Sequence, residues 1–323
     1  WDVTATLGMR DKTVEVVQVE KGDGSANFGV AVDVGTTTVV AALVDMNTGE
    51  VLGVKGTYNK QLMYGSDVIT RIIHASEKGG LEQLRRAVVD NVNSLTAALV
   101  SEKSVKMSHV TSMSCAGNTT MTHLLMGIDP SFIRKEPYIP TAGFLPVVRA
   151  AEVGIRINPR GLLACLPSVA SYVGGDITAG VLASGMNESE NLSILVDLGT
   201  NGEIVLGNRD WLTCAACSAG PAFEGSGIKC GMRARNGAIQ SVKISADLCV
   251  EYGVIGGVKP HGICGSGLID LLGEMLRSGV IDRAGKINSG KKSGRIRFNG
   301  ECMEFIVAGA AETDSGEDVV VTE

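Results

Sequence analysis

The sequence predicts an α/β protein built from two related lobes, and three observations support this fold class. The chain of 323 residues exceeds the usual size of a single hydrophobic core, so two domains are expected. Segments 30–34 and 192–196 are short, apolar and rich in β-branched residues, which predicts two buried strands. Each strand ends in Asp-x-Gly-Thr and leads into a second apolar strand, so one hairpin design occurs twice. The duplication indicates paired lobes that close on a phosphate.

The two hairpin turns carry residues that suit a phosphate and its metal ion. Aspartate is disfavoured in strands, so Asp33 and Asp197 at the strand ends are candidates for holding Mg²⁺, directly or through water. Glycine permits a tight turn, and hydroxyls with successive N–H groups form a concavity that binds anions. The candidate phosphate-binding residues are Gly35, Thr36, Thr37, Thr38, Gly199, Thr200 and Asn201. One copy alone would indicate an ordinary turn, and the chain contains neither a P-loop nor a G-x-G-x-x-G motif.

The first part of the chain predicts mainly strands. Residues 1–27 contain one apolar alternation, at 13–19, and we interpret this segment as the last hairpin of a preceding domain. The first lobe then begins with a three-stranded meander at 28–34, 39–45 and 51–56.

Helices follow the meander. Residues 65–74 place a serine and an aspartate before apolar positions at helical spacing, and residues 81–103 form a longer amphipathic pattern. A strand is expected at 105–116 and a third helix at 119–126. Six prolines lie within 129–168, which we interpret as an irregular insertion.

The second lobe repeats the pattern of the first. A helix at about 176–185 leads to strands at 192–196 and 202–207, and a third strand is expected at 211–216. The order of strand, Asp-x-Gly-Thr, strand, turn and strand is therefore an internal repeat.

Three further features are expected after this repeat. Residues 239–244 and 249–252 predict another hairpin, and residues 266–278 predict a helix. N–H groups at that helix start suit a phosphate or ribose, which makes Gly265, Ser266 and Gly267 binding candidates. Residues 283–300 are basic and rich in glycine, and we interpret them as a solvated loop.

With both hairpins in view, the chain resembles the actin/Hsp70/sugar-kinase (ASKHA) ATPase superfamily. The resemblance implies an actin-like ATPase fold of two RNase H-like lobes with mixed sheets, here lobe I at 28–190 and lobe II at 191–323. It also implies that the helix start at 174–185 positions the attacking water, so Asp176 is a catalytic candidate. Glu203, a few residues after the second turn, is a second candidate base.

Within the superfamily, four motifs resemble signatures of the activators of corrinoid proteins. They lie at 116–125, 197–203, 218–225 and 262–270. The resemblance implies an enzyme that couples ATP hydrolysis to reduction of a Co(II) corrinoid to Co(I), which restores methyl transfer. The cofactors would be ATP and Mg²⁺, and the partner a corrinoid protein of a methyltransferase system. A homodimer is a further expectation.

Two departures from that family are expected to matter. Family members carry an N-terminal [2Fe–2S] ferredoxin domain, and its cysteine spacing does not occur in this chain. The adenosine-binding glycine loop and final helices are also expected beyond residue 323. We therefore interpret the chain as a fragment with a truncated lobe II. The alternatives are a small-molecule kinase with Asp176 as its base, and a non-enzymatic module that docks a corrinoid protein.

Composition narrows the function classes. The net charge of −6 argues against nucleic acid or an anionic membrane as the main partner, and no apolar run approaches membrane-spanning length. The eight cysteines indicate cytoplasmic thiols rather than a disulfide framework. Cys214, Cys217 and Cys230 give C-x₂-C-x₁₂-C, but a metal site would also need Cys249 or His261. We interpret the first pair instead as small buried residues on a strand, and His74, His109 and His123, which are isolated, as structural.

Overall fold

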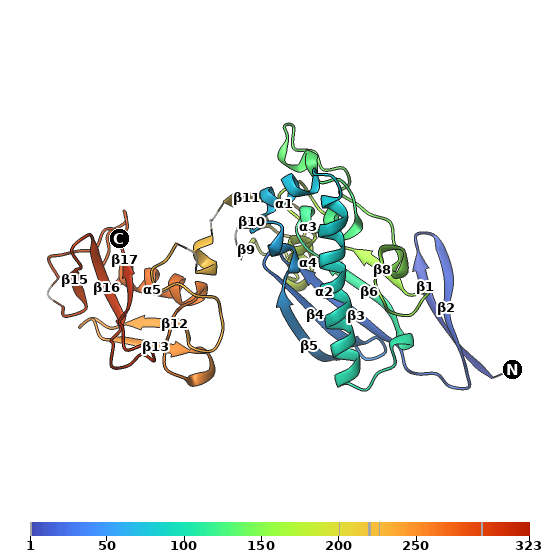
Figure 1. The fold of residues 1–323 in the computed structure, drawn as a ribbon, viewed down its shortest axis with the longest axis horizontal. Helices are drawn as coiled ribbons and strands as arrows, with labels where there is room; N and C mark the ends of the chain where they lie inside the picture. Colours follow the sequence, from blue (N-terminus) through green and yellow to red (C-terminus); the bar gives the residue numbers. More distant parts are fainter. Residues whose placement is uncertain (1, 200, 219–220, 226, 292) are drawn as a thin grey trace. The chain divides into compact units, whose positions relative to one another are not determined.

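The computed structural model describes the chain except for six positions, and its residues form two compact units. The described ranges are 2–199, 201–218, 221–225, 227–291 and 293–323. Unit 1 comprises Trp1–Leu195 and Glu203–Ala216, and unit 2 comprises Val196–Gly202 and Cys217–Glu323. Each unit is described by itself, and Figure 1 gives the element labels.

Unit 1 is built on a six-stranded mixed sheet with the order β5-β4-β3-β6-β8-β7. The strands are β3 (Phe28–Val34), β4 (Thr38–Asp45), β5 (Val51–Tyr58), β6 (Val110–Ala116), β7 (Val148–Arg149) and β8 (Leu162–Cys165). β3, β4 and β5 pair antiparallel, whereas β3, β6 and β8 run parallel. The predicted three-stranded meander is confirmed.

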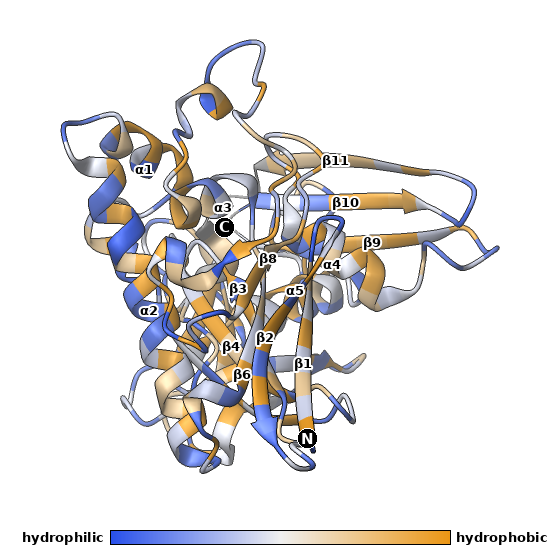
Figure 2. Ribbon diagram, turned by 90° about the vertical axis from the view of Figure 1, so that its right-hand side faces the viewer, coloured by the Kyte–Doolittle hydropathy of each residue, from blue (hydrophilic) through white to orange (hydrophobic). Residues whose placement is uncertain are grey.

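Buried and exposed side chains alternate along β3, so one face of the strand belongs to the core and the other carries Asp33. Val30, Val32 and Val34 are buried, whereas Ala31 and Asp33 are exposed, as expected when side chains point to opposite faces of a strand. The buried face packs against α2 (Gly80–Glu102), whose buried apolar residues recur every three or four positions. Figure 1 shows α2 running along β3, β4 and β5, and Figure 2 shows hydrophobic colour on β3 and β4.

Two shorter helices of unit 1 have clear sequence causes for their starts. Asp67 and Thr70 form a capping box at the start of α1 (Val68–Ala75), and the Asn118 side chain caps α3 (Thr119–Met126). Short 3₁₀ turns connect the longer elements of the unit. They are η1 (Lys60–Met63), η2 (Met107–His109), η3 (Ser131–Arg134) and η4 (Ala150–Val153).

The N-terminal hairpin packs on the main sheet of unit 1. Its strands β1 (Val3–Arg10) and β2 (Thr13–Lys21) are antiparallel, which confirms the predicted hairpin. Val17 is buried, and the Arg149 guanidinium pairs with the Glu15 carboxylate at 3.0 Å.

The strands on either side of the second Asp-x-Gly-Thr motif lie next to each other in one sheet. β9 (Ser193–Leu198), β10 (Asn201–Gly207) and β11 (Leu212–Ser218) make a sheet in the order β11-β10-β9, and the division between the units passes through these strands. Within unit 1, α4 (Gly175–Ser184) buries Ile177 in a small core with Val205. The predicted strands and the helix before them are therefore confirmed.

Unit 2 has its own core and two small sheets. The sheet β13-β12-β14 contains β12 (Ala238–Ile244), β13 (Val250–Val254) and β14 (Gly262–Ile263), and the other contains β15 (Ile296–Phe298), β16 (Met303–Ala308) and β17 (Val319–Thr322). α5 (Gly265–Arg277) packs on β12, and the turns are η5 (Pro221–Glu224) and η6 (Ile255–Gly257). Buried Ile239, Leu271 and Phe305 belong to one cluster.

Three expectations about local structure are corrected. The strand expected at 105–116 begins at Val110, because the residues before it form η2. The insertion expected at 129–168 is not irregular throughout. Its apolar segment β8 pairs with β6, and β7 pairs with β8. The loop expected at 283–300 contains β15, which pairs with β16.

In the described part of the chain, no helix combines the length and apolarity needed to cross a bilayer.

The core of unit 1 can be tested with two matched leucine substitutions. Leu84 on α2 is 0% exposed, whereas Leu182 on α4 is 60% exposed. We expect Leu84→Ala to lower the free energy of unfolding by about 2–5 kcal/mol, because it leaves a cavity. Leu182→Ala should change it by less than about 0.5 kcal/mol. Urea unfolding followed by circular dichroism measures both, and equal effects would contradict the assigned core.

Candidate functional site

The first Asp-x-Gly-Thr turn is a tight loop between β3 and β4. Gly35, Thr36 and Thr37 are half-buried, and Thr38 is exposed. A Cβ atom at Gly35 would lie 2.6 Å from the Thr38 carbonyl oxygen, so this position requires glycine. The sequence prediction of a glycine-dependent turn is thereby confirmed.

Three consecutive carbonyl groups of this loop accept hydrogen bonds from unit 1. The Asn59 side chain donates to the Gly35 oxygen at 2.9 Å, and the Asn59 backbone N–H donates to the Thr37 oxygen at 2.9 Å. The Arg71 guanidinium donates to the Thr36 oxygen at 2.6 Å. The hydrogen bonds that these carbonyl oxygens accept from Asn59 and Arg71 thus fix the conformation of the loop.

Peptide geometry then sets the direction of the loop N–H groups. In a planar trans peptide the N–H points opposite to the C=O. Because the oxygens of residues 35, 36 and 37 face their donors, the N–H groups of Thr36, Thr37 and Thr38 point away from those donors. Successive N–H groups arranged in this way make an anion-binding concavity. The residues present therefore fit a phosphate group.

Two other predicted motifs lie against this loop within unit 1. The Asn118 side chain donates to the Thr36 hydroxyl at 3.0 Å, and the N–H of Gly175 donates to the Gly117 oxygen at 2.9 Å. A Cβ at Gly174 would lie 2.4 Å from the Asn118 Cα, so glycine is needed for this approach. The start of α4, which carries the candidate Asp176, is therefore tied through residues 117 and 118 to the first turn.

The two carboxylates of unit 1 near this loop differ in their settings. Asp33 is exposed at the end of β3, where it is paired in register with Val40 and Ala116. Asp176 is half-buried in the first turn of α4, and its carboxylate accepts a hydrogen bond from the Ile177 N–H at 2.9 Å. Carboxylate oxygens are ligands that suit Mg²⁺, and Asp33 fits this role.

The second turn is described only in part. Asp197 is exposed at the end of β9, and Glu203 is half-buried on β10. The Gly199 N–H donates to the Asn201 oxygen at 2.9 Å, which closes a short hairpin. The candidate Thr200 lies outside the described residues.

The third set of candidates begins α5 in unit 2. A Cβ at Gly265 would lie 2.4 Å from the Phe223 oxygen, and one at Gly267 would lie 2.2 Å from the Ile239 oxygen. Ser266 lies between them, and its hydroxyl is 3.4 Å from the Cys264 sulfur. Close packing thus accounts for both glycines, and contact of this helix start with phosphate or ribose stays a prediction.

Sequence reasoning missed the side chains that support the first turn, namely Asn59, Gln61 and Arg71. Their exposed fractions are between 0 and 1%. Arg71 lies three and four positions from Val68 and Ala75, so helical spacing places it on the same face as apolar residues. This position was the available signal. No sequence signal predicted the contact between Arg71 and Thr36, because the two residues are 35 positions apart.

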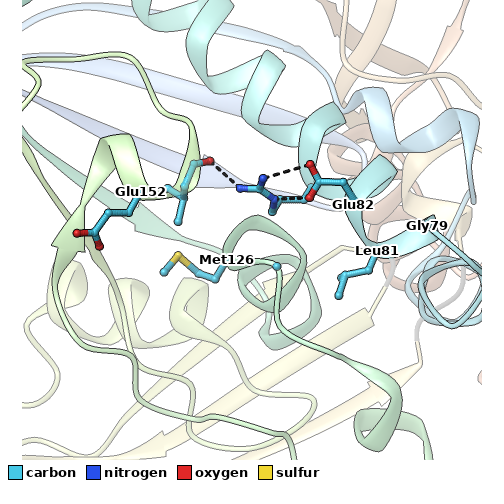
Figure 3. A pocket seen from close by; sticks show the side chains of 8 residues that line it. Gly79, Leu81, Glu82, Met126 and Glu152 are labelled. Atoms are coloured by element: carbon cyan, nitrogen blue, oxygen red, sulfur yellow. Dashed lines mark hydrogen bonds and ion pairs between the residues drawn. The ribbon is translucent and has the colours of Figure 1, made fainter.

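An open cavity of about 500 Å³ lies elsewhere in unit 1, beside α2 and α3. Figure 3 shows Glu82 bonded there to the guanidinium of Arg85, which also donates to the Val153 oxygen at 3.1 Å. Hydrogen bonds from Arg85 and Arg86 lower the pKa of Glu82 to about 2. None of the predicted site residues lines this cavity, so we assign it no ligand.

The cysteines and histidines have mostly structural settings. All eight cysteines are free thiols. Cys217 is exposed on β11, which corrects the expectation of a buried side chain, because successive strand residues alternate between faces. Among the described residues, no group of three or more His, Cys, Asp or Glu side chains is arranged to hold a metal ion.

His123 has partners that define its tautomer. Its Nδ1 lies 2.7 Å from the Thr119 oxygen, which can only accept, and its Nε2 lies 3.3 Å from the Ala142 N–H, which can only donate. The neutral ring protonated on Nδ1 satisfies both partners. Burial lowers the pKa of His123, and the hydrogen bond to Thr119 opposes that shift.

Comparison with known families matches nearly the whole chain. The model of the RACo middle region matches residues 28–189, and the model of the C-terminal domain of RACo, the ASKHA domain, matches residues 191–323. These matches agree with the actin-like ATPase fold predicted from the two hairpins and confirm it.

Three similar proteins are informative. The corrinoid activation enzyme RamQ of Eubacterium limosum is 31% identical over 306 residues, covering 92% of this chain and 51% of RamQ. The [Co(II) methylated amine-specific corrinoid protein] reductase of Methanosarcina barkeri is 25% identical over 297 residues, covering 82% of this chain and 53% of the reductase. A solved structure of a reductive activator for corrinoid, iron-sulfur protein is 51% identical with a TM-score of 0.85, covering 99% of this chain and 51% of that one. The chain thus spans about half the length of these relatives.

The setting of His123 predicts a pH dependence of stability. Below about pH 6.5 the ring gains a proton in the unfolded chain, whereas in the folded chain it gains the proton only at a lower pH, because its folded pKa is lowered. The unfolded state then binds more protons, so stability should fall as pH falls below 6.5. Urea unfolding between pH 8 and 5.5 measures this slope. His123→Asn should reduce the slope, and an unchanged slope in this variant would contradict the assignment.

Proposed function

The chain belongs to the RACo family, and we propose from this premise that it takes part in ATP-dependent reactivation of a corrinoid protein. In that activity, Co(II) in the corrinoid is reduced to Co(I) for methyl transfer. The relatives described above are corrinoid-activating enzymes, and one of them is a corrinoid protein reductase by name. The observation that carries the ATP-binding part is the first turn, where three carbonyls are held by unit 1 and three N–H groups face away from it.

Each predicted residue has a role in the proposed site. The turn residues of both hairpins would bind phosphate oxygens through N–H and hydroxyl groups, and the start of α5 would contact phosphate or ribose. Asp33 and Asp197 would hold a hydrated Mg²⁺, which, when bound, neutralises charge on the phosphates. Asp176 would orient the attacking water, and Glu203 is the second candidate for that role.

The cellular setting follows from the same proposal. The partner would be the corrinoid protein of a methyltransferase system, and a homodimer is a further prediction. Eight free thiols support a reducing compartment, so we place the protein in the cytoplasm. The electron would come from a [2Fe–2S] centre in a ferredoxin domain, as expected for this family.

ATP turnover distinguishes this proposal from its rivals. We expect Mg·ATP to bind to the chain, or to a longer version that matches the full length of the relatives, in isothermal titration. Hydrolysis should then respond to a Co(II) corrinoid protein, whose reduction is followed by its visible absorption. Turnover that responds to sugars or organic acids instead would favour a kinase. Binding of corrinoid protein without any binding of ATP would favour a docking module.

The two strand-end carboxylates can be tested by charge removal. Asp33→Asn and Asp197→Asn should each weaken Mg·ATP binding by about tenfold or more, because one ligand charge of the cation is lost. Asp90→Asn is the matched control, because Asp90 is exposed on α2 and belongs to no predicted site. Titration at several Mg²⁺ concentrations measures the effect. Metal dependence that stays at the wild-type level would contradict these assignments.

A further inference from the structure

Arg71 is a fully buried cation directly beneath the first turn. Its exposed fraction is 0%, and its guanidinium donates hydrogen bonds to four uncharged acceptors among the described residues. These are the Gly65 oxygen at 2.9 Å, the Gln61 side-chain oxygen at 3.1 Å, the Met121 sulfur at 3.2 Å and the Thr36 oxygen at 2.6 Å. The N–H donors of the guanidinium therefore have acceptors, but none of these acceptors carries a negative charge that would balance the charge of Arg71.

No carboxylate balances this charge at ion-pair distance among the described residues. The Asp67 carboxylate at the N-cap of α1 raises the pKa of Arg71 through its negative charge, and the Arg71 backbone N–H donates to the Asp67 backbone oxygen at 3.3 Å. Burial lowers the pKa of Arg71 to about 10, so the side chain remains cationic at neutral pH. Buried charges are normally paired, since removing them from water is costly.

The peptide between Thr36 and Thr37 connects this charge to the outer side of the turn. Arg71 donates to its oxygen, and its N–H points the opposite way, toward the anion-binding concavity. A hydrogen bond to the oxygen of a peptide polarises that group and strengthens its N–H as a donor. A negative charge at the concavity would thus be stabilised by Arg71 without touching it.

We propose that Arg71 is the buried counter-charge for the phosphate bound at the first turn, acting through the Thr36–Thr37 peptide. It is a positioning residue, and it makes binding favour ligands of higher negative charge. This inference rests on the proposed function, because it assumes that the turn binds phosphate.

A purely structural role makes a different prediction. In that case Arg71 serves only to tie α1 to the turn, and its loss would disturb the turn for every nucleotide to the same degree. The counter-charge role predicts a loss that grows with the charge of the ligand. The ratio of affinities for ATP and adenosine therefore separates the two roles.

Two substitutions remove the net charge in different ways. Arg71→Met removes the guanidinium and its hydrogen bonds. Gln61→Glu leaves Arg71 and its bond to Thr36 in place and puts a carboxylate where Arg71 already contacts a side-chain oxygen at 3.1 Å. Arg85→Met is the control, because that arginine is paired with Glu82 away from the turn. Circular dichroism establishes that each variant folds.

Dissociation constants for ATP, ADP and adenosine with Mg²⁺ give the test, measured by isothermal titration on a longer version that matches the full length of the relatives. Arg71→Met should raise the Kd for ATP on the order of tenfold, the Kd for ADP by less, and leave the Kd for adenosine nearly unchanged. Gln61→Glu should shift the same ratios in the same direction, and Arg85→Met should leave them at wild-type values.

The proposal is overturned if the ATP to adenosine ratio in folded Arg71→Met equals that of the wild type. It is also overturned if Gln61→Glu keeps the wild-type ratio, because the tie to Thr36 alone would then explain Arg71. Should Arg71→Met fail to fold, Gln61→Glu decides. A wild-type protein that binds neither ATP nor inorganic tripolyphosphate would overturn the proposed function together with this inference. An unchanged ATP to adenosine ratio in variants that still bind ATP would overturn the role of Arg71 alone.

Discussion

The candidate site depends on the three hydrogen bonds that hold consecutive carbonyl oxygens of the first turn. Asn59 supplies two of the donors and Arg71 supplies the third. With those oxygens fixed, trans peptide geometry directs the N–H groups of Thr36, Thr37 and Thr38 away from the donors that hold the oxygens. These hydrogen bonds within unit 1 hold the turn in one conformation, and such preorganisation reduces the entropy lost on binding. Gly35 is required by the same turn, because the loop closes too tightly for a side chain.

The hydrogen bonds to the first turn depend on a cluster of buried polar side chains inside the otherwise apolar unit 1. Gln61 donates to the Leu84 oxygen at 2.9 Å and accepts from Arg71, and Asn91 donates to the Tyr58 oxygen at 3.0 Å. A buried polar side chain is tolerated when it has hydrogen-bonding partners, so the cluster is consistent with a stable core. The sheet and α2 around it provide the apolar burial, and the cluster sets the position of the turn. Stability and site geometry are therefore carried by different residues of the same unit.

The sequence was sufficient for the parts of this site that are local in the chain. The hairpins, the glycines and the helix start at Asp176 all follow from short patterns, and the structure has them where those patterns predict. Asn59 and Arg71 could not be predicted as supports, because their contacts span 24 and 35 positions and depend on how α1 packs. The short strands β7 and β15 were missed for a related reason. A strand of two or three residues is defined by its neighbour in the sheet rather than by its own periodicity.

The internal repeat duplicates the hairpins, but the residue that follows the third strand differs between the two copies. In the first copy, the third strand β5 is followed directly by Asn59, whose side chain and backbone hold two carbonyls of the turn. In the second copy, the sequence after β11 continues with Ala219, which has no side-chain donor. The two copies thus share a motif, while the sequence does not repeat the side-chain donor of Asn59 at this position. Because Arg71 also donates to the first turn, the repeated sequence does not by itself imply that the two turns would contribute equally to the proposed phosphate binding.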